Sequence, residues 1–87
     1  MDTAIKAKEL VENFWHEISG VPNHVVMDFD SEDSYVILAK QCALIDNQNT
    51  IDALELAKEF IDDNQMYAFN MFIGSFEQVR KHIEGLK

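Results

Sequence analysis

The carboxylates are the residues of this chain whose types and spacing come closest to forming a chemical site. Several of them lie in the stretch MDFDSEDSYVIL, and reading from Asp28 gives acids at positions 1, 3 and 5 of an EF-hand calcium loop. That loop also needs a glycine at position 6 for its sharp turn and a bidentate glutamate at position 12. This chain has Asp33 and Ala39 at those positions. We therefore expect no dedicated calcium site.

The sequence also lacks the residue patterns that nucleophilic catalysis, zinc binding and phosphate binding require. Cys42 is the single cysteine, and the sequence shows no catalytic base paired with it. His16, His24 and His82 are too far apart for the i, i+4 spacing that directs two imidazoles to one zinc ion. No glycine-rich loop exists to hold phosphates. We predict that the protein is not an enzyme and binds neither a metal nor a cofactor.

The charge imbalance is the stronger functional signal. Sixteen acidic residues face seven basic ones, for a formal net charge of −9, and between Glu9 and Val79 the only bases are Lys40 and Lys58. Binding to a nucleic-acid backbone or to an anionic membrane depends on lysine and arginine. We therefore expect a basic protein surface as the partner, and neither nucleic acid nor membrane directly. The alternative is that the acidity serves only solubility.

Many of these acids gather on one face of a predicted helix. Residues 50–63 place apolar side chains such as Ile51 and Leu54 on one side, and the carboxylates fall within an arc of about 100° on the other. Asp28 and Asp30 share the outward face of a predicted strand, and further acids follow at its turn. The predicted partner-binding residues are therefore Asp28, Asp30, Glu32, Asp33, Asp52, Glu55, Glu59, Asp62 and Asp63.

Periodicity predicts the elements that position these acids. Apolar residues recur at helical spacing over 3–19 and 75–85, whereas residues 24–30 alternate as a half-buried strand does. The run 35–38 predicts a second strand, and QCALID predicts either a third strand or an irregular continuation of the second. MYAFNMFIG predicts a further strand that ends at a Gly74-Ser75 turn. The order α-β-β-(β)-α-β-α predicts an α+β domain, with an antiparallel sheet of three to four strands and helices packed on it.

A mostly α-helical bundle is the alternative fold. Tyr35, Leu38, Cys42 and Ile45 also fit 3,4,3 helical spacing, and a continuous helix could begin at Gln65. We expect one domain, 1–87, with a core that unites Phe14, Phe29, Leu38, Leu54, Ile61, Phe69, Phe76 and Val79. No apolar run is long enough to span a bilayer and no secretory signal is recognised. The single cysteine fits a reducing cytoplasm.

One region resembles a known family. An acidic turn before a Tyr-led strand, followed by NTIDALELAKEF, makes residues 24–60 similar to HicB-type antitoxins, small domains that block an RNA-cleaving toxin. The chain lacks that family's Gly-Tyr turn and its Pro- and Gly-rich segment after the second strand, so no site residue carries over. The resemblance implies a hairpin followed by a helix, and an inhibitory role.

These observations predict a small cytoplasmic inhibitor that occupies the basic surface of a nucleic-acid-binding protein in place of DNA or RNA. Phage anti-defence proteins, antitoxins and nuclease immunity proteins act in such settings. Two alternatives stay open. One is a structural or homodimeric module whose acidity serves solubility, and the other is a small-ligand binder with a pocket at a dimer interface.

Overall fold

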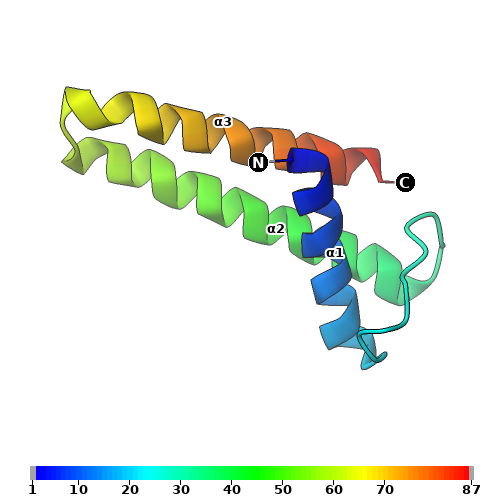
Figure 1. Ribbon diagram of the computed structural model, residues 1–87. Coiled ribbons are helices and arrows are strands. Elements are labelled where there is room, and N and C mark those ends of the chain that lie inside the picture. Colours follow the sequence, from blue (N-terminus) through cyan, green and yellow to red (C-terminus); the bar gives the residue numbers. More distant parts are fainter. Residues whose placement is uncertain (1, 87) are drawn as a thin grey trace.

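Three helices make up the regular structure of the chain (Figure 1). The computed structural model describes residues 2–86 and contains α1 (Thr3–Ser19), α2 (Ser34–Ala57) and α3 (Asp63–Gly85), with a short 3₁₀ helix, η1 (Lys58–Phe60), after α2. No strand occurs within residues 2–86. The predicted α+β fold with an antiparallel sheet is therefore wrong. The chain folds as an all-helical bundle, which was the alternative.

Helix α1 has the bounds that the sequence predicts, and both of its ends are capped. The Asp2 carboxylate accepts hydrogen bonds from the N–H groups of Ala4 and Ile5, at 3.0 and 3.2 Å, and so satisfies donors that every helix start leaves free. At the other end Gly20 has a φ of 72°, and its N–H donates to the His16 carbonyl. A Cβ would be strained in this left-handed conformation, so glycine is the residue that ends the helix.

Helix α2 replaces the predicted strands at 35–38 and QCALID, and it also runs through DNQNT, which joins QCALID to the predicted helix 50–63. The helix continues through this polar run because its side chains find partners. The buried Asn47 amide donates to the Phe76 carbonyl of α3 at 3.1 Å, and Thr50 donates to a carbonyl one turn back at 3.1 Å. These hydrogen bonds override the local preference of Asn and Thr for caps and turns.

Helix α3 runs without interruption through MYAFNMFIG, which was predicted as a strand, and through the predicted turn at Gly74-Ser75. At helical spacing the alternate residues of this segment cannot share a face: Ile73 is buried, whereas Tyr67 and Met71 are exposed. A strand here would need a neighbouring strand for its backbone hydrogen bonds. Within residues 2–86 the chain supplies none.

Residues 21–33 connect α1 to α2 as an irregular loop instead of the predicted first strand. The predicted alternation is right in one respect, because Met27 is buried and Phe29 packs against the core. Lys40 of α2 donates to the Phe29 carbonyl, and the Lys8 ammonium lies 5.9 Å from the centre of the Phe29 ring, which is a cation–π contact. These anchors hold the loop without strand pairing. The hairpin implied by the HicB resemblance is therefore not formed.

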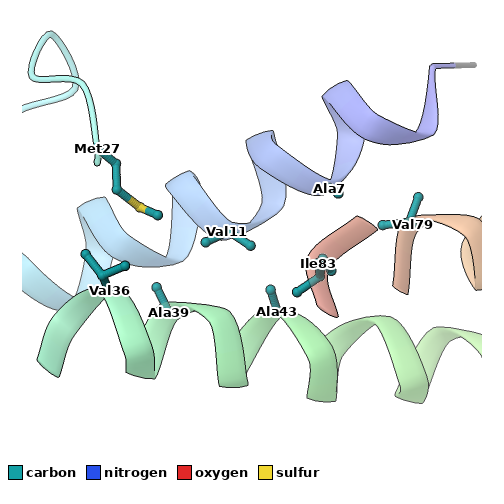
Figure 2. Packing of buried hydrophobic residues seen from close by; sticks show 8 residues of the cluster. All are labelled: Ala7, Val11, Met27, Val36, Ala39, Ala43, Val79 and Ile83. Atoms are coloured by element: carbon teal, nitrogen blue, oxygen red, sulfur yellow. The ribbon is translucent and has the colours of Figure 1, made fainter. Parts of the chain in front are cut away.

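The core lies where the three helices meet (Figure 2). Its buried side chains are Ala7, Val11, Met27, Val36, Ala39, Ala43, Val79 and Ile83. Of the predicted core, Val79 is buried, Phe14 and Phe29 pack half-buried against the cluster, and Leu38 is exposed. The remaining predicted members, which are partly exposed and lie outside the cluster, are Leu54, Ile61, Phe69 and Phe76. Alanines where the helices cross allow the backbones to approach closely, and the large rings lie at the edge.

The α2–α3 pair extends beyond α1 as a two-helix arm, which we define as residues 51–73. Figure 1 shows α1 crossing the pair near the end where α3 finishes, so that the other end is uncovered. Within the arm, Ile51 and Ile73 are the only buried residues. The molecule is elongated as a result, with extents of 45 × 21 × 19 Å. Among residues 2–86, none of the helices combines the length and the apolar character needed to cross a membrane.

Candidate functional site

The predicted acidic residues form two groups, the first of which lies in the loop before α2. We call Asp28, Asp30, Glu32 and Asp33 the loop acids, and all four are exposed. Asp28 accepts a hydrogen bond from the Asp30 N–H at 3.0 Å, and Asp33 caps α2 by accepting from the Tyr35 N–H at 2.8 Å. These two carboxylates therefore shape the loop and start the helix. Asp30 and Glu32 are the loop acids most available to a partner.

The second group lies on the arm and has a different geometry from the one predicted. We call Asp52, Glu55, Glu59, Asp62 and Asp63 the arm acids, and all five are exposed. The predicted helix was to continue to Asp63, but α2 ends at Ala57, and Ile61 is extended. Asp62 and Asp63 therefore belong to the start of α3, where the helix dipole favours negative charge. The predicted ladder on a single helix face is wrong for these two residues.

The arm acids are weakly neutralised by their neighbours. Gln48 donates to the Asp52 carboxylate at 3.0 Å, which orients that group without changing its charge. Lys58 lies 3.7 Å from Glu55, and half of the Glu55 side chain is exposed. An ion pair this exposed contributes little to stability and is easily exchanged for another partner. Lys58 is also the only basic residue of the arm.

The two groups of acids do not form one continuous surface. Asp33 precedes the first residue of α2, and Asp52 lies 19 positions further along the chain, which corresponds to about 28 Å at 1.5 Å per residue. Fields of exposed charges are screened over about 8 Å at physiological ionic strength. The loop acids and the arm acids are therefore two separate candidate sites.

Exposed apolar side chains accompany the arm acids, and the sequence interpretation placed three of them, Tyr67, Met71 and Phe72, on a strand. Phe60 is 83% exposed, Tyr67 75% and Leu56 62%, and Met71 and Phe72 are also more than half exposed. For Tyr67, Met71 and Phe72, the signal that could have revealed their exposure is the lack of a charged side on MYAFNMFIG, because a helix with one covered face normally has a polar one opposite. Large apolar groups next to uncompensated charge are typical of protein-interaction surfaces.

A cavity lies at the base of the arm, where α1 meets α2 and α3. Its volume is about 250 Å³, and its walls include Leu10 of α1, Asn47 and Thr50 of α2, and Phe76 and Val79 of α3. Asn47 is 2% exposed, and its Oδ1 atom accepts no hydrogen bond from residues 2–86. The cavity is smaller than most small-molecule sites. Its position shows where the packing of the three-helix core ends and the arm begins.

The remaining candidate residues for chemistry are dispersed. The His16 ring nitrogen Nδ1 lies 3.0 Å from the Val21 carbonyl, and its Nε2 lies 3.6 Å from Glu12. Cys42 is partly buried in a shallow depression beside Phe14. Within residues 2–86, no three His, Cys, Asp or Glu side chains are arranged to hold a metal ion.

Comparisons of the chain with protein-family models, with curated proteins and with solved structures find no match. Its function must therefore be inferred from the geometry and charge of the molecule.

Proposed function

We propose that this chain is a non-enzymatic protein that binds the basic surface of a nucleic-acid-binding protein through the arm and so blocks that protein's access to DNA or RNA. The observation that supports the proposal most directly is the composition of the arm, where five exposed carboxylates stand beside exposed aromatic and aliphatic side chains with Lys58 as the only base. The single cysteine, which is partly buried and unpaired within residues 2–86, agrees with a reducing compartment such as the cytoplasm.

The two kinds of residue would have separate roles in such a complex. Carboxylates attract a basic surface from a distance and accelerate encounter, whereas buried apolar contacts slow dissociation. Basic sites for phosphate groups are the surfaces that an acidic arm complements best. The loop acids are a weaker candidate site, because the carboxylates of Asp28 and Asp33 already accept hydrogen bonds from the backbone of the loop and of the start of α2.

The first experiment is capture of partners from the native host at low and at high salt, followed by a competition assay. The captured protein is incubated with its DNA or RNA and with increasing amounts of this chain. We expect capture at low salt, loss of capture at high salt, and displacement of the nucleic acid. A partner that binds nucleic acid equally well with and without this chain would contradict the inhibitory role.

A matched pair of charge variants tests the arm itself. The arm variant carries Asp52→Asn, Glu55→Gln, Glu59→Gln, Asp62→Asn and Asp63→Asn. The control variant removes the same number of exposed charges elsewhere, through Glu9→Gln, Glu17→Gln, Asp30→Asn, Glu32→Gln and Glu84→Gln. Both variants should fold, and at low salt the arm variant should associate at least about tenfold more slowly than the control. Equal association rates would show that net charge matters and the arm does not.

Self-association is the second candidate function, and the exposed apolar side chains Leu56, Phe60 and Tyr67 favour it. Sedimentation of the purified protein distinguishes the two functions. A stable dimer that forms without any basic partner and persists at low salt would support a structural module.

A further inference from the structure

The outward face of α2 carries a line of three exposed apolar side chains, interrupted between the second and the third by the exposed Asn49. Leu38, Ile45 and Leu56 are separated by seven and eleven residues, so their side chains leave the helix within about 20° of one another. All three are exposed, by 44%, 62% and 62%. Ile45 lies two residues after the buried Ala43, and it is therefore rotated about 200° away from the core side. We call this line the outer face of α2.

The outer face would be unusual as a solvent-exposed helix surface. Helix α2 also buries Val36, Ala39 and Ala43 on its inner side, so it presents apolar residues in nearly all directions. A helix that is apolar all round is normally enclosed by other elements. From Leu38 to Leu56 the line extends about 27 Å. This is the length of a helix about three heptads long, so an extended helical partner could contact all of it.

The charges on and beside this face favour a basic occupant. Asp52 lies on the same line, seven residues after Ile45. Glu59 follows the end of α2 in η1, and both acids are exposed. The two lysines of this region are engaged elsewhere, since Lys40 donates to the Phe29 carbonyl and Lys58 lies 3.7 Å from Glu55. The face therefore offers apolar and anionic groups together, and an amphipathic helix rich in lysine and arginine complements both.

From this complementarity we propose that the outer face of α2 binds a basic amphipathic helix of the partner protein, laid along α2 with its apolar stripe on Leu38, Ile45 and Leu56. The inference rests on the proposed function and specifies the element of the partner that is bound. Asp52 and Glu59 would contact the basic residues beside that stripe. The interaction would add a further helix to the bundle by ordinary helix–helix packing.

A second copy of this chain fits the same face poorly. Antiparallel pairing that sets Leu38 against Leu56 of the other copy would also bring the loop acids of each copy toward Asp62 and Asp63 of the other. Each chain carries a net charge of −9, and such juxtaposition of like charges is costly. A basic helix meets no such repulsion.

The test uses three synthetic peptides about three heptads long. The first has leucine at the a and d positions and lysine or arginine on its remaining faces. The second contains the same residues in an order that has no apolar stripe, and the third keeps the stripe but replaces the basic residues with glutamate. Binding is followed by calorimetry and by amide chemical shifts of the labelled protein. We expect saturable binding of the first peptide, about tenfold or more tighter than of the second, with shifts centred on α2, and no binding of the third.

Two protein variants locate the site. Ile45→Gln with Leu56→Gln removes apolar groups from the outer face, whereas Ile5→Gln with Val26→Gln removes as many exposed apolar groups from α1 and from the loop that follows it. Because all four side chains are exposed, both variants should keep the parent's helix content. The first variant should lose about tenfold or more in affinity for the basic amphipathic peptide, and the second should bind it as the parent does.

The results that would overturn this inference differ from those that would overturn the proposed function. Equal binding of the first two peptides, or equal affinity of the two variants, would show that the outer face is not the docking site. Dimerisation that the Ile45 and Leu56 changes abolish would identify a second copy as the occupant. If the peptide results hold but captured partners bind no nucleic acid, the proposed function fails while the docking inference stands.

Discussion

Replacement of Gly74 by alanine tests the continuity of α3 directly. The sequence pattern predicts a turn at Gly74, whereas the structure has α3 running through it from Asp63 to Gly85. In a helix interior, glycine is less favourable than alanine by about 0.5–1 kcal/mol, because it loses more backbone entropy on folding. An ideal Cβ at Gly74 meets no atom within 4 Å outside the local helix backbone. Nothing in the packing therefore offsets the gain, and Gly74→Ala should stabilise the protein.

The size of the effect can be converted into a melting temperature. The entropy of unfolding is about 2.1 cal/mol/K per residue, or about 180 cal/mol/K for these 87 residues. A gain of about 0.5–1 kcal/mol then raises Tm by about 3–5 °C. Thermal unfolding followed by the negative circular dichroism band of α-helices at 222 nm measures this shift. If Gly74→Ala lowers Tm or leaves it unchanged, α3 is not a continuous helix through this position.

Gly20 supplies the matched control. An added Cβ at Gly20 also meets no atom within 4 Å, but the residue has a φ of 72°. Alanine is strained in that conformation by about 1 kcal/mol. The same substitution in an equally open environment should therefore lower Tm by about 5 °C. Opposite signs at the two positions would show that backbone conformation, and not side-chain contact, decides the outcome.

Five further substitutions test the core, a cap and the polar contact between α2 and α3. Ile83→Ala should lower the free energy of unfolding, measured by urea denaturation, by about 2–5 kcal/mol, because Ile83 is almost fully buried. Phe69→Ala should lower it clearly less, because that ring is partly exposed. The reverse order would contradict the core described here. Asp33→Ala should cost about 1 kcal/mol by removing the cap of α2, and Asp33→Asn should restore most of it; equal losses in both would point to charge instead of capping. Asn47→Leu should raise the free energy of unfolding by about 1 kcal/mol, since it removes a buried acceptor without a partner and fills part of the adjoining cavity. A loss of stability there would show that the bond to Phe76 outweighs the unpaired oxygen.

The sequence predicts the helices whose periodicity and caps agree, and it fails where local propensity and tertiary packing disagree. Residues 3–19 combine an apolar stripe with Asp2 and Gly20 at the ends, so the prediction for α1 is confirmed. The run from Tyr35 to Leu38 has strand propensity, but Val36 and Ala39 sit on the face that packs against α1. Contacts distant in sequence decide this segment, and no local pattern contains them.

The candidate site shows the same division between what is local and what is not. Exposure of all nine predicted acids follows from their charge, and the structure agrees. Their separation into loop and arm groups depends on where α2 ends. The exposed side chains of Phe60 and Tyr67 were not predicted, because apolar residues are normally assigned to a core. The absence of a third helix over the arm, visible in Figure 1, leaves those side chains uncovered.

The thin packing of the arm has a consequence for how tightly any partner binds. Isolated helical segments as short as the two in the arm are marginal in water. The arm therefore depends on the buried Ile51 and Ile73, and on the hydrogen bond from Arg80 to Gln48 at its base, to remain paired. Segments with few buried contacts open at a lower free energy than the global unfolding of the chain, and their amides exchange with solvent first. A partner that recognises only the closed arm must supply the free energy of closing it. Affinity can therefore change through substitutions at the base of the arm that never touch the partner. Hydrogen exchange of residues 51–73 would measure the free energy of opening the arm before any partner is added.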